Sequence, residues 1–165
     1  MKHTMRTGMV LLSHGSLLCG AGQTLAEHAE RLRQTEKYAA IEVGYLNFSE
    51  PPFEDAIERC LLAGVRRIVV APYFLVDGKY VTETIPQRLQ EARARFPNVK
   101  FVLARSLSFD PLLADAVVEM AARARPPERW RDDMLAAPRY CLAREQCPLH
   151  STIVCPKSFP QVPSL

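Results

Sequence analysis

The stretch Val10-Leu11-Leu12-Ser13-His14-Gly15-Ser16 decides how this chain of 165 residues folds. An apolar run ends abruptly in a histidine, a glycine and a serine. This is the pattern of a buried parallel strand that delivers a polar side chain at its carboxyl end, where open α/β sheets bind ligands. Histidine titrates near neutral pH and, as a neutral ring, binds late transition metals. The stretch predicts His14 at a ligand site, although a histidine at a strand end can also be purely structural.

Residues 7–125 alternate short β-like segments with helical patterns. Most of these segments are rich in Val, Ile or Leu without polar alternation, as expected for strands that are covered on both faces. The β-α order predicts an α/β fold with a four-stranded, mostly parallel sheet and right-handed crossovers. The expected strands are Met9–Ser13, Ile41–Tyr45, Arg67–Tyr73 and Lys100–Ala104.

Amphipathic helices are expected between and after these strands. Pro52 and Pro111 stand where a helix begins, and Gly64 stands where one ends. Asp110 before Pro111 predicts an N-cap. Apolar residues share one face in each of three helices: Phe53, Ile57, Leu61 and Gly64; Ile85, Leu89, Ala92 and Phe96; Leu113, Ala116, Val117 and Met120.

The C-terminal residues 126–165 differ from the rest. They contain more than half of the chain's 13 prolines and none of its 7 glycines. We expect an α/β domain over residues 7–125 and a Pro/Cys-rich tail over residues 126–165, extended or loosely docked, with a short helix near Trp130–Leu135. A unit of this size is small for a protein that binds ligands in a cleft, which favours a homodimer.

Composition excludes several classes of protein. The hydrophobic fraction of 48% and the charged fraction of 24% are those of a globular protein. The net charge of +3 is too small to indicate nucleic-acid binding and would suit an anionic small molecule. No apolar stretch is long enough to span a membrane, and the N-terminus makes a poor signal peptide. We therefore expect a cytoplasmic protein. In such a chain the odd count of 5 cysteines favours free thiols or metal ligands over a disulfide framework.

The loops that follow the strands meet at one edge of such a sheet. They offer a histidine, a carboxylate, an amide, a phenol, an amine and hydroxyls to one cleft: His14 and Ser16; Asn47, Ser49 and Glu50; Phe74, Leu75, Lys79 and Tyr80; Ser106 and Ser108. Each has a simpler interpretation. Glu50 could favour the next helix start through the helix dipole, and Asp77-Gly78 is a common turn pair. No nucleotide-binding glycine pattern is complete, and His28 is expected to be solvated.

The tail carries a second candidate site. Cys141, Cys147, His150 and Cys155 lie within fifteen residues and could hold zinc or an iron–sulfur cluster. Their spacing matches no common zinc finger. The alternative is a tail with scattered cysteines.

Over residues 8–124 the chain resembles the short CbiX type of sirohydrochlorin chelatase, a relative of the class II chelatases that include ferrochelatase. The resemblance rests on the strand into His14-Gly15-Ser16, on Tyr45–Pro51, on Gly64–Leu75 and on Gly78–Pro86. It implies insertion of a divalent metal (cobalt, iron or nickel) into sirohydrochlorin, a polycarboxylated tetrapyrrole, on the route to cobalamin or sirohaem. It also implies a homodimer and requires no organic cofactor.

The chain departs from the family pattern at two positions. His14 matches the first family histidine, but Tyr80 stands where the second is usual. Asn47 replaces a carboxylate that is common after the second strand, and Glu50 remains nearby. Phenol and amide groups are poorer ligands for cobalt or iron than imidazole. The chain is therefore expected to be either a divergent chelatase with one key histidine or a relative that binds tetrapyrrole or metal without turnover.

The expected mechanism assigns a role to each edge residue. His14 holds the metal or accepts a pyrrole proton, with Glu50 as a second acceptor or ligand. Tyr80 and Asn47 position the ring edge or a metal-bound water, and Phe74 and Leu75 contact the face of the macrocycle. Ser16 lies in the binding cleft. Lys79, with Arg66 and Arg67, contacts the substrate's carboxylates. A third possibility is a structural partner of a larger enzyme of the same pathway.

Overall fold

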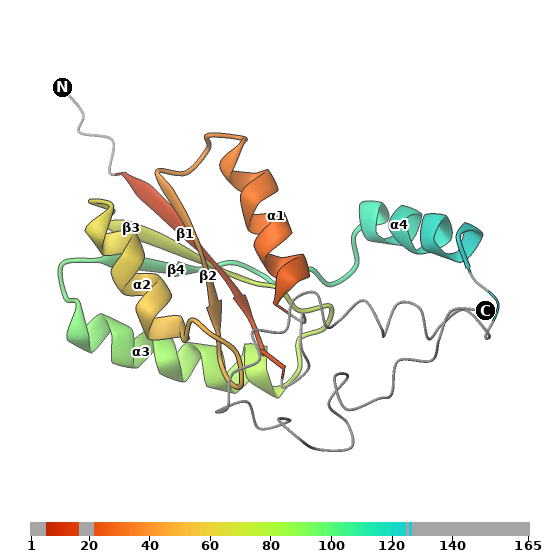
Figure 1. Cartoon of the computed structure of the whole chain (residues 1–165). Coiled ribbons are helices and arrows are strands. Elements are labelled where there is room, and N and C mark those ends of the chain that lie inside the picture. Colours follow the sequence, from red (N-terminus) through yellow and green to blue (C-terminus); the bar gives the residue numbers. More distant parts are fainter. Residues whose placement is uncertain (1–5, 17–21, 125, 127–165) are drawn as a thin grey trace, which may run out of the picture.

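The computed structural model describes residues 6–16, 22–124 and 126. Figure 1 shows a single sheet with helices on both sides. All four predicted strands are present, within two residues of the expected limits. The elements are β1 (Thr7–Ser13), α1 (Gln23–Arg33), β2 (Ala40–Tyr45), α2 (Phe53–Leu62), β3 (Arg67–Pro72), the π-helix η1 (Tyr80–Thr84), α3 (Ile85–Arg95), β4 (Lys100–Leu103) and α4 (Pro111–Ala122).

The sheet has the strand order β2-β1-β3-β4, and every pair is parallel. The predicted parallel α/β fold is therefore confirmed. β1 is a central strand between β2 and β3, so the loop that begins at His14 lies between the loops that follow those two strands. This is the point at which the chain's connections leave β1 in opposite directions, the usual ligand position of an open parallel sheet.

Right-handed crossovers determine which helix covers which face. The connection from β1 to β2 runs one way across the sheet and places α1 on one face, where Leu11, Ile41 and Leu25 form a small cluster. The connections to β3 and β4 run the other way and place α2 and α3 on the opposite face, where the larger core includes Phe53 and Leu89. Two helices thus cover one face and one helix covers the other (Figure 1).

Helix ends follow the sequence signals. Gly64 has a φ of +77° directly after the α2 C-cap, a conformation that favours glycine. The Asp110 carboxylate accepts a hydrogen bond from the Leu112 amide at 2.8 Å, which caps α4 as predicted. The predicted apolar face of α4 exists, but no residue of this helix is buried.

Two further expectations concern residues at the limits of the described chain. The tail helix near Trp130–Leu135 and the tail metal site lie outside the described residues, and the division into a domain of residues 7–125 and a tail stays a prediction. Among the described residues, no helix has the length and hydropathy needed to cross a membrane.

Candidate active site

His14 makes two short hydrogen bonds at the carboxyl end of β1. Its Nδ1 lies 2.9 Å from the carbonyl oxygen of Gly15, and its Nε2 lies 2.7 Å from the hydroxyl of Tyr80. A carbonyl oxygen only accepts hydrogen bonds, so Nδ1 carries the proton in the neutral ring. Nε2 is then the basic nitrogen, and it accepts the hydrogen bond that Tyr80 donates. The backbone thus fixes one tautomer and leaves Nε2 as the atom able to bind a metal or accept a proton.

Aromatic rings surround this pair. The ring centroids of His14 and Tyr80 are 4.5 Å apart and those of His14 and Phe48 are 5.6 Å apart, both in edge-to-face geometry. Phe74 stacks on Tyr80 at 6.2 Å. Phe48 is 63% exposed and Tyr80 38% exposed, so the site opens to solvent through apolar surface rather than being enclosed. A flat aromatic ligand would find matching faces here.

Gly15 lets the His14 loop approach the loop after β2. A Cβ atom at Gly15 would lie 1.7 Å from the carbonyl oxygen of Asn47, and the φ of Gly15 is +92°. The close approach is held by backbone and hydroxyl bonds. The Asn47 amide donates to the His14 carbonyl at 2.9 Å, and the Ser49 hydroxyl accepts from the Ser16 amide at 2.9 Å while donating to the Ser16 carbonyl at 3.1 Å. The glycine is therefore required by space and by conformation.

The loop that carries Tyr80 is tied to the loop after β4. The buried Ser106 hydroxyl donates to the Asp77 carboxylate at 2.5 Å, and the Leu107 amide donates to the Phe74 carbonyl at 2.9 Å. Tyr80 then begins the π-helix η1, an irregular helix form that is frequent at functional sites. Sequence reasoning treated Asp77 as a turn residue and missed this pair. The sequence indicates this pair only by placing a serine after β4 and an aspartate after β3, which is the neighbouring strand.

The structure brings some predicted residues together and leaves others separate. Ser16, Asn47, Phe74 and Tyr80 lie in the hydrogen-bonded or ring-stacked group around His14. Glu50, Leu75 and Lys79 are exposed on the same loops, and no side chain of these three makes a hydrogen bond or ion pair with another described residue.

The expected roles of Arg66 and Arg67 in substrate binding are wrong. Arg67 opens β3, so it lies at the amino edge of the sheet, one strand length (about 17 Å) from the His14 edge. Arg105 follows β4 at the carboxyl edge and is exposed. The sequence analysis did not name this cation. Its position just after a predicted strand could have indicated that it lies at the carboxyl edge of the sheet.

Other titratable groups do not join the site. Burial raises the pKa of the Cys60 thiol to about 12, with a smaller contribution from the negative charge of Glu42, so the thiol stays protonated at neutral pH. Burial also raises the pKa of Tyr45. His28 was expected to be solvated; it is exposed, but it also hydrogen-bonds the Tyr73 hydroxyl at 3.0 Å. No three His, Cys, Asp or Glu side chains gather as a metal site within the described part of the chain.

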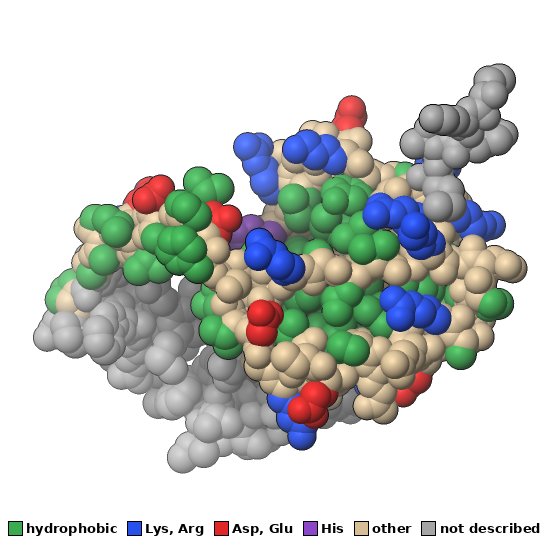
Figure 2. Space-filling model, turned by 180° about the vertical axis from the view of Figure 1, so that it is seen from behind, with side chains coloured by type: hydrophobic (Ala, Val, Ile, Leu, Met, Phe, Trp, Pro, Cys, Tyr) green, Lys and Arg blue, Asp and Glu red, His purple; other side chains and the backbone are tan. Residues whose placement is uncertain are grey.

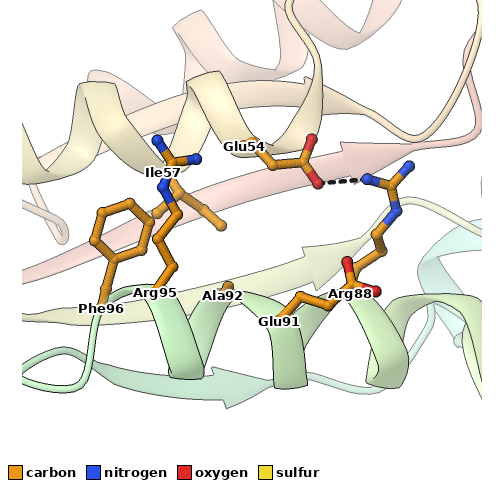
Figure 3. Close-up of a pocket in the computed structure, with 7 residues that line it drawn as sticks. All are labelled: Glu54, Ile57, Arg88, Glu91, Ala92, Arg95 and Phe96. Atoms are coloured by element: carbon orange, nitrogen blue, oxygen red, sulfur yellow. Dashed lines mark hydrogen bonds and ion pairs between the residues drawn. The ribbon is translucent and has the colours of Figure 1, made fainter.

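A pocket of about 230 Å³ lies between α2 and α3, away from His14 (Figure 3). Ile57, Ala92 and Phe96 supply its apolar lining. Arg88 is paired with Glu54 across it at 2.6 Å, and Arg95 is paired with Glu58 at 2.5 Å. The pocket is smaller than ordinary ligand sites and its arginines already have partners. We interpret it as a seam between two packed helices.

Comparison with known proteins identifies the family. The CbiX family model matches residues 8–124. The chain is 27% identical over 110 residues to the chloroplastic sirohydrochlorin ferrochelatase of Arabidopsis thaliana, which covers 67% of this chain and 49% of the relative. It is 35% identical over 81 residues to the sirohydrochlorin cobaltochelatase of Methanocaldococcus jannaschii, which covers 49% of this chain and 57% of the relative. The chain thus spans about half the length of these curated relatives.

A solved structure of similar fold supports this family assignment, and the similarity covers nearly the whole of that structure's chain. The CbiX protein of Marinobacter aquaeolei VT8 superposes with a TM-score of 0.60 at 25% identity, over 72% of this chain and 99% of that one. The family match over residues 8–124 includes His14 and the loops that hold it. On the extent of the family match, this chain belongs to the CbiX family.

Proposed function

We propose that this protein is a metal chelatase that inserts a divalent metal ion, Co²⁺, Fe²⁺ or Ni²⁺, into sirohydrochlorin or a related tetrapyrrole of cobalamin or sirohaem biosynthesis. One observation carries the proposal: His14 presents a basic Nε2, fixed by the Gly15 carbonyl and bonded to Tyr80, at an open aromatic edge of the sheet. Family membership and the names of the relatives support the same reaction.

Insertion exchanges two pyrrole N–H protons for one divalent metal ion that must lose its waters. His14 Nε2 can bind the incoming ion or accept one of these protons, because a neutral imidazole nitrogen is both a metal ligand and a base. The Tyr80 hydroxyl occupies Nε2 before the reaction, so it has to turn away when the metal or proton arrives. Metal and protons therefore compete for one nitrogen, and insertion should slow as the pH falls below the range in which imidazole is neutral.

Residues around His14 would position the macrocycle. Phe48, Phe74 and Leu75 provide exposed or half-buried apolar surface for its face, and Lys79 and Arg105 are exposed cations on the same edge for its carboxylates. Tyr80 and Asn47 would orient the ring edge or a metal-bound water, and Ser16 would line the cleft. Glu50 is exposed and without a partner among the described residues, and it would serve as the second proton acceptor.

The site of one copy is open on one side, and we propose that the chain works as a homodimer in which a second copy helps to enclose the tetrapyrrole. We also propose a cytoplasmic location, in which the buried Cys60 would stay a free thiol. No organic cofactor is required by this chemistry. Zinc or iron–sulfur binding at Cys141, Cys147, His150 and Cys155 remains a separate prediction.

The replacement of the second family histidine by Tyr80 favours one alternative, a protein that binds metal or tetrapyrrole without inserting one into the other. An anaerobic absorbance assay separates the two. Purified protein is mixed with sirohydrochlorin and Co²⁺, Fe²⁺ or Ni²⁺ in turn, beside a blank without protein that measures spontaneous insertion. We expect catalytic turnover above the blank with at least one metal. Tetrapyrrole binding with an insertion rate equal to the blank would contradict the proposal and establish the alternative.

A further inference from the structure

The loop after β2 contains a strained turn centred on Phe48. The Ser49 amide donates a hydrogen bond to the Asn47 carbonyl at 2.7 Å, and Phe48 between them has a φ of +61°. A three-residue turn of this hand is rare and strained, because the Cβ atom of the central residue crowds the backbone. Glycine adopts this conformation without that cost. Phe48 therefore stands where the backbone favours glycine.

The neighbours of Phe48 hold the turn in this form. On one side, the Asn47 amide donates to the His14 carbonyl at 2.9 Å. On the other side, the Ser49 hydroxyl is hydrogen-bonded to the amide and the carbonyl of Ser16. These bonds attach the β2 loop to the loop of His14. The strain at Phe48 therefore follows from the way in which two active-site loops meet.

The Phe48 side chain contributes little to the fold. Its ring is 63% exposed and belongs to neither cluster of the hydrophobic core. Among the described residues its aromatic contact is with His14, at 5.6 Å between ring centroids. A glycine would suit the turn better and would leave both core clusters intact. Packing therefore does not explain a phenylalanine at this position.

Exposed hydrophobic side chains elsewhere in the molecule do not share this strain. Figure 2 shows such side chains on α4 and on the body beside it. Three described residues other than glycine have a positive φ, and two of them, Glu36 and Ser108, are polar. Phe48 is the only large apolar residue of the described chain in this conformation, which is a genuine outlier for a bulky side chain. Of the apolar residues at the carboxyl edge, Phe48 is thus the one that the fold itself opposes.

We infer that Phe48 binds the face of the tetrapyrrole, and that the strained turn fixes its backbone for this contact before the ligand arrives. The inference rests on the proposed function. His14 lies beside an aromatic ring from each neighbouring loop, Phe48 after β2 and Tyr80 after β3, both in edge-to-face geometry. A macrocycle centred near His14 Nε2 is much wider than an imidazole, so it extends over these loops and meets the exposed Phe48 ring. A backbone that is fixed beforehand lowers the entropy lost on binding.

The test separates the side chain of Phe48 from the strain of its turn. In the full chain, Phe48→Gly removes the ring and relieves the turn, Phe48→Ala removes the ring and keeps the strain, and Phe48→Trp keeps a flat aromatic face. Binding of metal-free sirohydrochlorin is measured by absorbance titration, stability by thermal denaturation and oligomeric state by analytical ultracentrifugation. Glu36→Gly is the matched control, because Glu36 has a φ of +53° between α1 and β2, at the opposite edge of the sheet.

We expect Phe48→Gly and Phe48→Ala to bind sirohydrochlorin about tenfold more weakly than the unaltered protein, because each loses one aromatic contact. Phe48→Trp should bind within about threefold of it. Phe48→Gly should denature at a higher temperature than Phe48→Ala and no lower than the unaltered protein, since relief of the turn offsets the loss of a mostly exposed ring. Glu36→Gly should leave binding unchanged.

Three results would each overturn the inference. Undiminished binding by Phe48→Gly would show that the ring does not contact the ligand. Denaturation of Phe48→Gly below Phe48→Ala would show that the turn is not strained, and a changed oligomeric state would show that the ring meets a second copy instead. These results leave the proposed reaction standing if the unaltered protein still inserts metal. An unaltered protein that binds no sirohydrochlorin would overturn both, and one that binds it without insertion would overturn the reaction alone.

Discussion

Two histidine–tyrosine pairs lie near the carboxyl edge of the sheet, and the contrast between them shows what makes one a site. His14 follows β1 and bonds Tyr80 at 2.7 Å, while His28 lies within α1 and bonds Tyr73 at 3.0 Å. The side chains are the same in kind. Their surroundings differ in the partner of the second ring nitrogen and in the rings nearby.

The Gly15 carbonyl holds Nδ1 of His14, and Phe48 and Phe74 complete an aromatic group around the pair. His28 is exposed, and only one of its ring nitrogens has a hydrogen-bond partner among the described residues. In a metal-binding histidine, a hydrogen bond from the other ring nitrogen to a backbone carbonyl, such as that from His14 to Gly15, fixes the tautomer. Backbone support, rather than the presence of a histidine and a phenol, therefore distinguishes the candidate active site.

The largest effect is expected from removing that backbone support. In Gly15→Ala the added Cβ meets the Asn47 carbonyl, so the loop must move or the free energy of unfolding falls by about 3 kcal/mol. Metal insertion should be lost in either case. Chemical denaturation and the insertion assay measure the two effects, and Gly78→Ala is the matched control because its Cβ would meet nothing within 4 Å. Equal behaviour of the two variants would contradict the role given to Gly15.

A smaller effect is expected at Tyr80. Tyr80→Phe keeps the ring but removes the hydrogen bond to His14, and a loss of about 1 kcal/mol of positioning corresponds to a roughly fivefold lower kcat/KM. Tyr80→His supplies a second imidazole and should tighten Co²⁺ binding, measured by calorimetry. Tyr73→Phe makes the same change in the other pair. If it lowered the insertion rate as much as Tyr80→Phe, the distinction between the pairs would fail.

The smallest effect is expected from the tie between the loops after β3 and β4. Ser106→Ala removes one hydrogen bond to the Asp77 carboxylate, which is exposed and can bind water instead, so the free energy of unfolding should fall by only about 0.5 kcal/mol. The loop that carries Tyr80 loses one anchor, and KM for the tetrapyrrole should rise more than kcat falls. Thermal denaturation and steady-state kinetics measure both. An unchanged KM would show that this hydrogen bond does not position the loop.

The fold was predictable because its signals are local. Apolar runs without polar alternation, Gly64 after a helix and Asp110 before Pro111 each specify an element or its end from neighbouring residues. The position of His14 followed from the same logic, because the end of a buried strand is also the edge of the sheet. The exposure of α4, of which no residue is buried, was not predictable, since an apolar face at helical spacing does not state which surface it meets.

The details of the site depend on contacts between residues far apart in sequence. The bonds from His14 to Tyr80 and from Ser106 to Asp77 join residues 66 and 29 positions apart. Arg66 and Arg67 were misplaced because their charge was considered without the end of the strand to which they belong. Arg105 was missed for the same reason.

The role of His14 in metal insertion is tested by the insertion rate of His14→Ala compared with that of His28→Ala. Both variants lose one imidazole and one bond to a tyrosine, and circular dichroism verifies that both fold. With sirohydrochlorin and Co²⁺ or Fe²⁺ under anaerobic conditions, His14→Ala should fall to the rate of the blank, while His28→Ala should stay within about twofold of the unaltered protein. Undiminished insertion by His14→Ala, or equal losses in both variants, would contradict the account.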